Sequence, residues 1–419
     1  MSTCPHMIHP KPKAVAWSDS LLSFCRDGCS RTLFFCENCR LQSNHPLARY
    51  CRRCGEPISF ENIESRFENG FYLDDPDGTR YSYKLSPYGI TTVHALKSFR
   101  GHLIVVADRS VLVFDVHNLL SPLLGFKPPD NAYIQGVTQP LSSDDDRLIV
   151  TTDRNVYYLG LMDKGSKPFS IHNVAETRVI RYPVIRLGEK LLVFEYDQLS
   201  KTSWLIQSPD SVLAQFNGPV LSPTVISDDK VFFFTQREAL LYNSRTDSVI
   251  SKELIEPLRE SPPAFIKEVE SIYAVGERML WRFDLGNETL VPTSLPTKHY
   301  AEASLSAKDF SLIVAHSSGL CLLDAFGSIK WDSSKEFIEA QSDGLPPQLY
   351  GNYFTFSSIG RLGGTVLRIH RLDNPSSFRD QFVFDKRLLC APLLTLGKLI
   401  VAVGDGLSAE LLVFNLERP

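Results

Sequence analysis

The chain has 419 residues, more than one small hydrophobic core can organise, so we expect several ordinary domains or a small domain joined to a large repeat array. A hydrophobic fraction of 43% and a formal net charge of -4 predict a folded, soluble protein. No apolar run approaches the roughly 18 residues of a membrane-spanning helix, and residues 1–20 lack the apolar core of a secretory signal. We therefore expect a cytoplasmic protein with no membrane contact.

The first predicted element is a zinc ribbon with its core at residues 31–60. Cys36 pairs with Cys39 and Cys51 with Cys54 in two Cys-x2-Cys motifs eleven residues apart, and Gly55 follows the last cysteine. Each motif can aim two thiolates at one ion, so together they predict a tetrahedral Zn2+ site. Four thiolates leave no position for water, so this metal is structural and supplies the folding energy of a domain with little core.

This segment resembles the zinc-ribbon family, including the double zinc ribbons of bacterial multidomain proteins. The resemblance implies structural zinc and a role in contacting protein or nucleic acid. A second zinc site is possible before the ribbon, although the spacing there departs from the ribbon pattern, and the alternative is a tail with free thiols. Its candidate ligands are Cys4, His6, His9, Cys25 and Cys29.

The ribbon region, residues 1–60, is basic: it contains eight Lys or Arg and four Asp or Glu, a balance of +4. Its aromatic residues Phe34, Phe35 and Tyr50 can stack on bases or pack the small core of the ribbon. Nucleic-acid binding through the ribbon is therefore one functional hypothesis. Basic residues that merely keep a small domain soluble are the alternative.

Residues 61–78 form a predicted linker, and residues 79–419 form a predicted β-propeller. A short apolar strand recurs every 40 to 46 residues, as in LIVVA at residue 103, LLVFE at residue 191 and LIVAV at residue 399, and a second strand follows each one. Several short strands with this period are typical of propeller blades, whose faces are buried only against neighbouring blades. We count eight units, and seven blades remain the alternative if the first unit is irregular.

The start of the array is expected to close the propeller. The strand LLVFN at residue 411 ends shortly before residue 419 and leaves no room for an outer strand in the last blade. That strand is expected from Thr79 to Leu85, after the turn at residues 75–78. Such an exchange removes open sheet edges, which would otherwise promote aggregation.

The repeated units resemble pyrroloquinoline-quinone-type and WD-repeat propellers over residues 79–419. The Gly-His and Trp-Asp marks of WD repeats occur once each, at residues 101–102 and 331–332, and the chain has only four tryptophans. The docking tryptophans of quinoprotein enzymes are therefore scarce, and we expect no small-molecule cofactor.

No phosphate-binding loop, nucleophile elbow or HExxH helix occurs in the sequence. We interpret the Asp144–Asp146 run and Asp228–Asp229 as solvated turns, and the isolated histidines as structural. We interpret the two cysteines outside the ribbon region as small buried side chains. The histidines and cysteines concerned are His316, His370, Cys321 and Cys390.

These observations favour a non-enzymatic protein-interaction scaffold, a subunit of a bacterial multiprotein system that contacts its partner through the propeller rim and the ribbon. Nucleic-acid binding through the basic ribbon is the first alternative. A propeller enzyme with its site at the channel mouth is the second, and its residues would come from different blades.

Overall fold

The computed structural model describes residues 80–99, 101–116, 122–129, 131–139, 147–161, 168–293, 304–316, 319–333, 342–359, 364–376 and 378–416. These residues belong to two compact units. Unit 1 contains residues 80–98 and 350–416, and unit 2 contains residues 99–116 and 122–349, with the gaps just given. Among the described residues, no helix is both long enough and apolar enough to span a membrane.

The described residues form eight antiparallel sheets with the strand order of an eight-bladed β-propeller. We call them blades 1 to 8 in chain order. Blade 1 contains β2 (Ala95–Phe99), β3 (His102–Val106), β4 (Val111–Asp115) and β5 (Leu124–Phe126). Blade 2 contains β6 (Ile134–Thr138), β7 (Arg147–Thr152), β8 (Asn155–Gly160) and β9 (Phe169–Asn173). Blade 3 contains β10 (Arg178–Ile180), β11 (Ile185–Leu187), β12 (Lys190–Asp197), β13 (Thr202–Gln207) and β14 (Ser211–Asn217).

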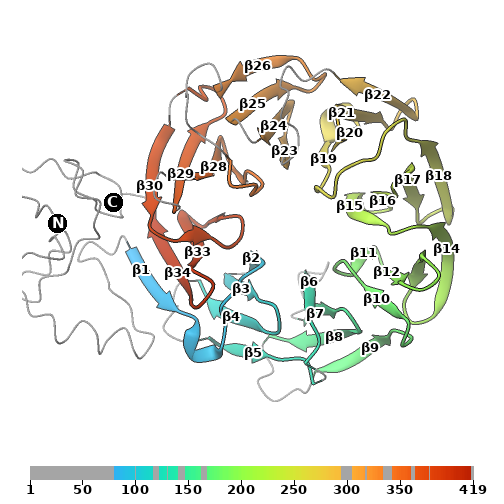
Figure 1. Ribbon diagram of the computed structural model, residues 1–419, viewed down its shortest axis with the longest axis horizontal. Coiled ribbons are helices and arrows are strands. Elements are labelled where there is room, and N and C mark those ends of the chain that lie inside the picture. The colour runs from blue at the N-terminus through green and yellow to red at the C-terminus, as the bar shows by residue number, and fades with distance from the viewer. Residues whose placement is uncertain are drawn as a thin grey trace, which may run out of the picture. The chain divides into compact units, whose positions relative to one another are not determined.

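Blade 4 contains β15 (Leu221–Ser227), β16 (Lys230–Phe234), β17 (Glu238–Asn243) and β18 (Ser248–Glu253). Blade 5 contains β19 (Ala264–Ile266), β20 (Ser271–Val275), β21 (Leu280–Asp284) and β22 (Thr289–Thr293). Blade 6 contains β23 (Ser304–Lys308), β24 (Ser311–His316), β25 (Gly319–Asp324) and β26 (Ile329–Asp332). Within unit 2, β6, β11, β15, β19 and β23 lie on the inner side of a curved row of sheets, and β9, β14, β18, β22 and β26 lie on its outer side (Figure 1).

Blade 7 contains β27 (Leu349–Tyr350), β28 (Tyr353–Ile359), β29 (Thr365–Arg371) and β30 (Phe378–Phe384). Blade 8 contains β31 (Arg387–Leu388), β32 (Leu393–Thr395), β33 (Lys398–Gly404), β34 (Ala409–Asn415) and β1 (Arg80–Lys84). Two short 3-10 helices, η2 (Ser86–Tyr88) and η3 (Lys267–Val269), lie after β1 and between β19 and β20. The prediction of eight blades is confirmed.

The second and third strands of the blades are apolar along most of their length because both of their faces are covered. In β16, four consecutive residues from Val231 to Phe234 are buried. Blades 3 and 4 meet through aromatic rings. The centre of the Phe233 ring lies 5.0 Å from that of Phe194 and 5.2 Å from that of Phe216, both in edge-to-face contact. Such pairs add to the burial of apolar area, so inter-blade packing is the main source of the core.

Blade 3 departs from the repeat at its first strand, which is divided into β10 and β11. The interruption contains Pro183, whose ring lies so close to Gly136 of blade 2 that a side chain there would collide with it. Gly136 has φ 153°, a conformation that favours glycine. The Thr138 hydroxyl donates a hydrogen bond to the carbonyl of Val184. Proline and glycine at these positions therefore allow the two inner strands to approach closely.

The predicted closing strand is present in unit 1. β1 pairs antiparallel with β34 over its whole length, from Arg80 opposite Phe414 to Lys84 opposite Glu410. Beyond the strand, the N–H of Leu85 donates to the carbonyl of Ala409 at 2.9 Å, and the Leu85 side chain is fully buried. Blade 8 thus takes its outer strand from the beginning of the array, and no outer edge of β34 is left open.

Candidate functional site

The loops of unit 2 fall into two groups. Because neighbouring strands within a blade are antiparallel, the turns between second and third strands lie at the same end as the connections to the next blade. We call this the connection end, and the end with the remaining turns the opposite end. Loops that extend from rigid sheets are where binding residues concentrate in propellers.

The two most exposed large apolar side chains of unit 2 among the described residues lie at the connection end. Leu199, in the turn between β12 and β13, is 80% exposed, and Ile255, between β18 and β19, is 86% exposed. At the opposite end, Phe326 in the turn between β25 and β26 is 65% exposed. Exposed apolar groups therefore occur at both ends, and the connection end has the more exposed pair.

Both connection-end side chains lie beside a hydrogen-bonded carboxylate. Asp197 accepts a hydrogen bond from the N–H of Leu199 at 2.8 Å, which lowers the pKa of the Asp197 carboxyl. Beside Ile255, Glu256 accepts hydrogen bonds from Trp281 Nε1 at 2.8 Å and from the N–H of Met279 at 3.2 Å. The exposed Leu199 and Ile255 are consequently presented on ordered turns.

An arginine and a tyrosine lie in contact at the connection end of blades 1 and 2. The Arg109 guanidinium lies 4.6 Å from the centre of the Tyr133 ring and donates to its hydroxyl at 2.8 Å. The N–H of Tyr133 donates to Asp153 at 3.0 Å, and the Tyr133 side chain is 49% exposed. Arginine and tyrosine are enriched in protein–protein interfaces.

A polar contact joins the segment between β10 and β11 of blade 3 to the connection before β19 of blade 5. Glu260 accepts a hydrogen bond from the Tyr182 hydroxyl at 2.6 Å and pairs with Arg181 at 3.1 Å. Burial and the bond to Glu260 raise the pKa of Tyr182 well above its ordinary value, so this phenol stays protonated. The contact holds the connection before β19 against the divided strand of blade 3.

A buried network lies where β9 meets blade 3. His172 Nε2 is 2.7 Å from the Glu195 carboxylate, and its Nδ1 is 2.7 Å from the carbonyl of Pro209. Arg178 donates to the other oxygen of Glu195 at 3.0 Å, and its guanidinium lies 3.9 Å from the centre of the Trp204 ring. His172 and Glu195 are 5% and 3% exposed, so this ion pair is part of the interior.

The charges and hydrogen bonds of this network shift the pKa values of His172 and Glu195. Burial alone lowers the pKa of His172, but its hydrogen bonds to Glu195 and Pro209 and the nearby charges of Glu195 and Asp210 outweigh burial and raise it. Burial alone raises the pKa of Glu195, but hydrogen bonds from His172 and Arg178 outweigh burial and lower it. Each partner favours the charged form of the other. The arrangement joins neighbouring blades through buried side chains.

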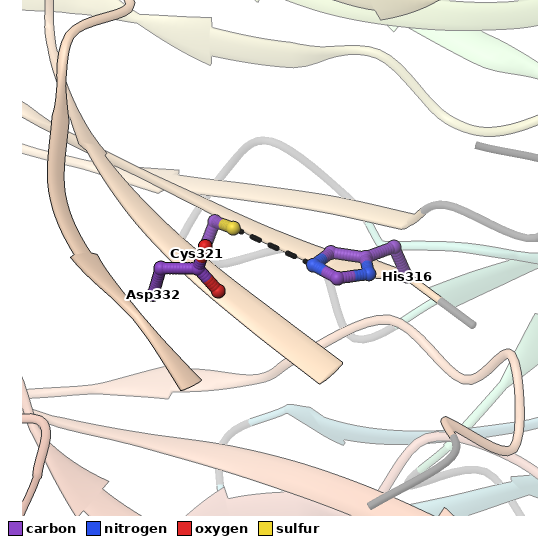
Figure 2. A group of neighbouring side chains, drawn as sticks. All are labelled: His316, Cys321 and Asp332. Carbon is purple, nitrogen blue, oxygen red and sulfur yellow. Dashed lines mark hydrogen bonds between the residues drawn. The ribbon is translucent and has the colours of Figure 1, made fainter. Parts of the chain in front are cut away.

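A cluster of metal-ligand types lies in blade 6. His316 ends β24, Cys321 lies in β25 and Asp332 ends β26, and the sulfur of Cys321 is 3.4 Å from His316 Nε2. Figure 2 shows the thiol directed at the imidazole, with the carboxylate of Asp332 beside Cys321. One ligand atom of each residue lies within 4.8 Å of the others, and their exposures are 1%, 0% and 8%.

The structure adds a contact to the interpretation of single residues. The sheet brings His316 to Cys321, and Cys321 is buried as expected. His370 fits a structural role: it stacks on Phe354 at 5.2 Å and bonds to the carbonyl of Pro375 at 2.8 Å. Cys390 is buried, which raises the pKa of its thiol to about 12.

Other predicted sites fall elsewhere in the chain. Asp229 lies in the turn between β15 and β16 as expected, bonded to Ser227 at 2.6 Å and paired with Arg245 at 2.7 Å. The acidic run at residues 144–146 lies outside the described residues. So do the ribbon ligands Cys36, Cys39, Cys51 and Cys54 and the candidate second-site ligands Cys4, His6, His9, Cys25 and Cys29.

Comparison with known proteins identifies the fold. Neither the models of known protein families nor the sequences of curated proteins match this chain. The structure is similar to Saccharomyces cerevisiae Sqt1, with 11% identity and a TM-score of 0.55 over 78% of this chain and 96% of Sqt1. It is also similar to BBS1N in complex with ARL6DN, with 10% identity and a TM-score of 0.47 over 78% of this chain and 93% of that one. At such identities the similarity establishes the fold alone.

The expectation that the protein is not an enzyme needs correction. Oligogalacturonate lyase, solved in complex with manganese, is also similar, with 12% identity and a TM-score of 0.47 over 82% of this chain and 95% of the lyase. The missing sequence motifs do not exclude catalysis by this chain. The physical reason is that a propeller can assemble a site from side chains of several blades, which no local motif records.

Proposed function

We propose that the protein is a protein-interaction module that binds a partner at the connection end of unit 2, within a bacterial multiprotein system in the cytoplasm. The observation that supports this proposal most strongly is the exposure of Leu199 and Ile255 on ordered turns at the same end of the sheets. Apolar side chains already held in position lose little conformational entropy when a partner covers them.

The composition of this end also suits a protein partner. Arg109 and Tyr133 are stacked and largely open to solvent, so they can contribute both apolar area and hydrogen bonds. An exposed ion pair, Arg181–Glu260, adds polar groups elsewhere in unit 2. A mixed polar rim around a few apolar anchors is the usual anatomy of a protein interface.

The test compares the two ends of the sheets. The full-length chain is used to isolate its partner from the native host, and the dissociation constant is then measured with the purified partner. Leu199→Asp and Ile255→Asp are each expected to weaken binding at least tenfold, because loss of an interface anchor costs about 1 to 2 kcal/mol or more. Phe326→Asp, at the opposite end, is the matched control and is expected to leave the affinity unchanged. Unchanged affinity in both connection-end variants would refute this surface.

For the N-terminal region, we propose a structural Zn2+ bound by Cys36, Cys39, Cys51 and Cys54. The support is the spacing of the two Cys-x2-Cys motifs. Metal analysis of the full-length chain is expected to find one zinc more per chain than in the Cys36→Ser, Cys39→Ser double variant. Retention of the full zinc content in that variant would contradict the proposal.

A second proposed function is nucleic-acid binding through the same region. Five arginines support it: Arg31, Arg40, Arg49, Arg52 and Arg53. Phosphate contacts release counterions, so affinity for single-stranded nucleic acid is expected to fall steeply as salt rises from about 50 to 200 mM. Binding that is absent at low salt, or indifferent to salt, would exclude this function.

A further inference from the structure

Three potential metal ligands of blade 6 project from one face of its sheet. Cys321 of β25 is paired directly with Asp332 of β26 and with Val314 of β24, so these side chains share a face. His316 lies two residues after Val314 and therefore projects to that face as well. Its partner across the strands is Gly319, which has no side chain and leaves the imidazole room to reach Cys321.

We propose that His316, Cys321 and Asp332 bind a zinc ion. In a tetrahedral site with Zn–N near 2.0 Å and Zn–S near 2.3 Å, the nitrogen and sulfur ligands are about 3.5 Å apart. The observed distance from His316 Nε2 to Cys321 Sγ is 3.4 Å, and all three ligand atoms lie within 4.8 Å of one another. The sheet thus already holds His316 and Cys321 at the spacing of two ligands of one ion, with Asp332 beside them.

The donor set selects the metal. A thiolate and an imidazole favour zinc and disfavour the hard cations Mg2+ and Ca2+, which take oxygen ligands. The cluster is buried, with His316 and Cys321 at 1% and 0% exposure. A divalent cation offsets the cost of placing a thiolate and a carboxylate together in the interior. Three protein ligands leave one tetrahedral position for water or another donor, unlike a closed four-cysteine site.

Comparison of equivalent positions in other blades singles out His316. At the equivalent position, blade 2 has Thr152, the last residue of β7, and blade 4 has Thr235, the residue after β16. The Thr152 hydroxyl accepts a hydrogen bond from the N–H of Asn155 at 2.8 Å, and the Thr235 hydroxyl accepts one from the N–H of Glu238 at 3.2 Å. A threonine is therefore sufficient to order this turn. The histidine of blade 6 is not needed for the turn, which is consistent with a ligand role.

The experiment measures zinc per chain in the full-length protein. The wild type is compared with His316→Thr, which introduces the residue found in blades 2 and 4, and with Asp332→Asn, which preserves side-chain size. Cys390→Ser is the control, because it removes another buried thiol that lies outside the cluster. The ribbon cysteines are unchanged in all four proteins, so any zinc they hold cancels in the comparison. Circular dichroism establishes that each variant is folded.

The proposal predicts that His316→Thr and Asp332→Asn each contain one zinc fewer than the wild type and the control. If a variant retains partial occupancy, its affinity in a chelator competition is expected to be at least tenfold weaker. In cobalt-loaded protein, the two variants are expected to lose part of the thiolate-to-cobalt absorption that the control retains. Equal zinc content and equal cobalt spectra in all folded proteins would show a metal-free hydrogen-bonded cluster and overturn the proposal. If one variant fails to fold, the other decides on the same criteria. If both fail, the wild type is compared with the Cys36→Ser, Cys39→Ser variant. The proposal is then overturned if that variant has lost all of the zinc found in the wild type.

Discussion

Replacement of Glu195 by glutamine tests whether the network beside β9 stabilises the fold. In the native protein, Glu195 accepts hydrogen bonds from His172 at 2.7 Å and from Arg178 at 3.0 Å, and its side chain is 3% exposed. Removing one partner of a buried ion pair destabilises a protein by about 3 to 5 kcal/mol. The glutamine oxygen still accepts one bond, and the Arg178 side chain is 29% exposed and can reach water. We therefore expect a loss near the lower limit, about 3 kcal/mol.

The loss should depend on pH with a definite sign. The pKa of His172 is raised above 6.5. The contribution of its protonated form to the free energy of unfolding is therefore complete below about pH 6.5 and is lost as pH rises through the raised pKa. The pKa of Glu195 is lowered below 4.5, so its contribution is complete above about pH 4.5 and is lost as pH falls through the lowered value. The difference between wild type and Glu195→Gln is thus expected to be greatest between about pH 4.5 and 6.5.

The assay is urea-induced unfolding at pH 5.5 and at pH 8.5, followed by tryptophan fluorescence. Glu260→Gln is the control because Glu260 is also paired with an arginine, Arg181, but its side chain is 53% exposed. A surface pair contributes about 0 to 1 kcal/mol, so the control is expected to change stability little. An equal loss from Glu195→Gln at both pH values would refute the protonation of His172. A loss no larger than that of Glu260→Gln would refute the importance of the network.

Two further predictions concern unit 1. Tyr83 anchors the closing strand: it is 4% exposed, and its hydroxyl donates to the Tyr88 hydroxyl at 2.7 Å. Tyr83→Ala is expected to lower the free energy of unfolding by about 3 to 5 kcal/mol, and Tyr83→Phe by about 1 kcal/mol. Equal losses from the two variants in urea unfolding would contradict burial of the ring as the cause. Burial, despite the bond to the Pro375 carbonyl, and the charge of Arg368 lower the pKa of His370 to about 4. The unfolded chain then binds a proton between about pH 6.5 and 4 that the native chain does not, so stability is expected to fall in that range as pH falls, by up to about 3 kcal/mol. His370→Gln should weaken this acid sensitivity, and an unchanged pH profile of the unfolding midpoint would contradict it.

The repeat was predictable from the sequence because it depends on local patterns. Each second strand is a continuous apolar run, such as LIVVA at residue 103, and its sequence identifies it regardless of its neighbours. The closing strand was predictable by elimination, because β34 ends near residue 415 and an outer strand was still required. The division of blade 3 around Pro183 was not predicted, although a proline within a strand pattern does indicate such a break.

The buried polar networks were not predictable because their members are distant in the sequence. His172 and Glu195 are 23 residues apart and belong to different blades, so neither composition nor spacing relates them. Their contact depends on how β9 packs against blade 3, a relation that only the folded sheets establish. The same holds for Tyr182 and Glu260, which are 78 residues apart. Missing motifs therefore say little about which side chains this fold brings together.

The blade 6 cluster lies between these two cases. When the units are aligned on their second strands, His316 of LIVAH matches Thr152 of LIVTT and Thr235 of VFFFT. The sequence therefore already indicates that a histidine replaces a turn-forming threonine in blade 6. Cys321 follows within five residues and was also within reach. Asp332 was not, because its pairing with Cys321 depends on the register of β25 and β26, which shifts between Leu322 and Leu323. A repeat that departs from its neighbours at a buried, chemically active side chain thus indicates a candidate site, and strand register decides which distant residue completes it.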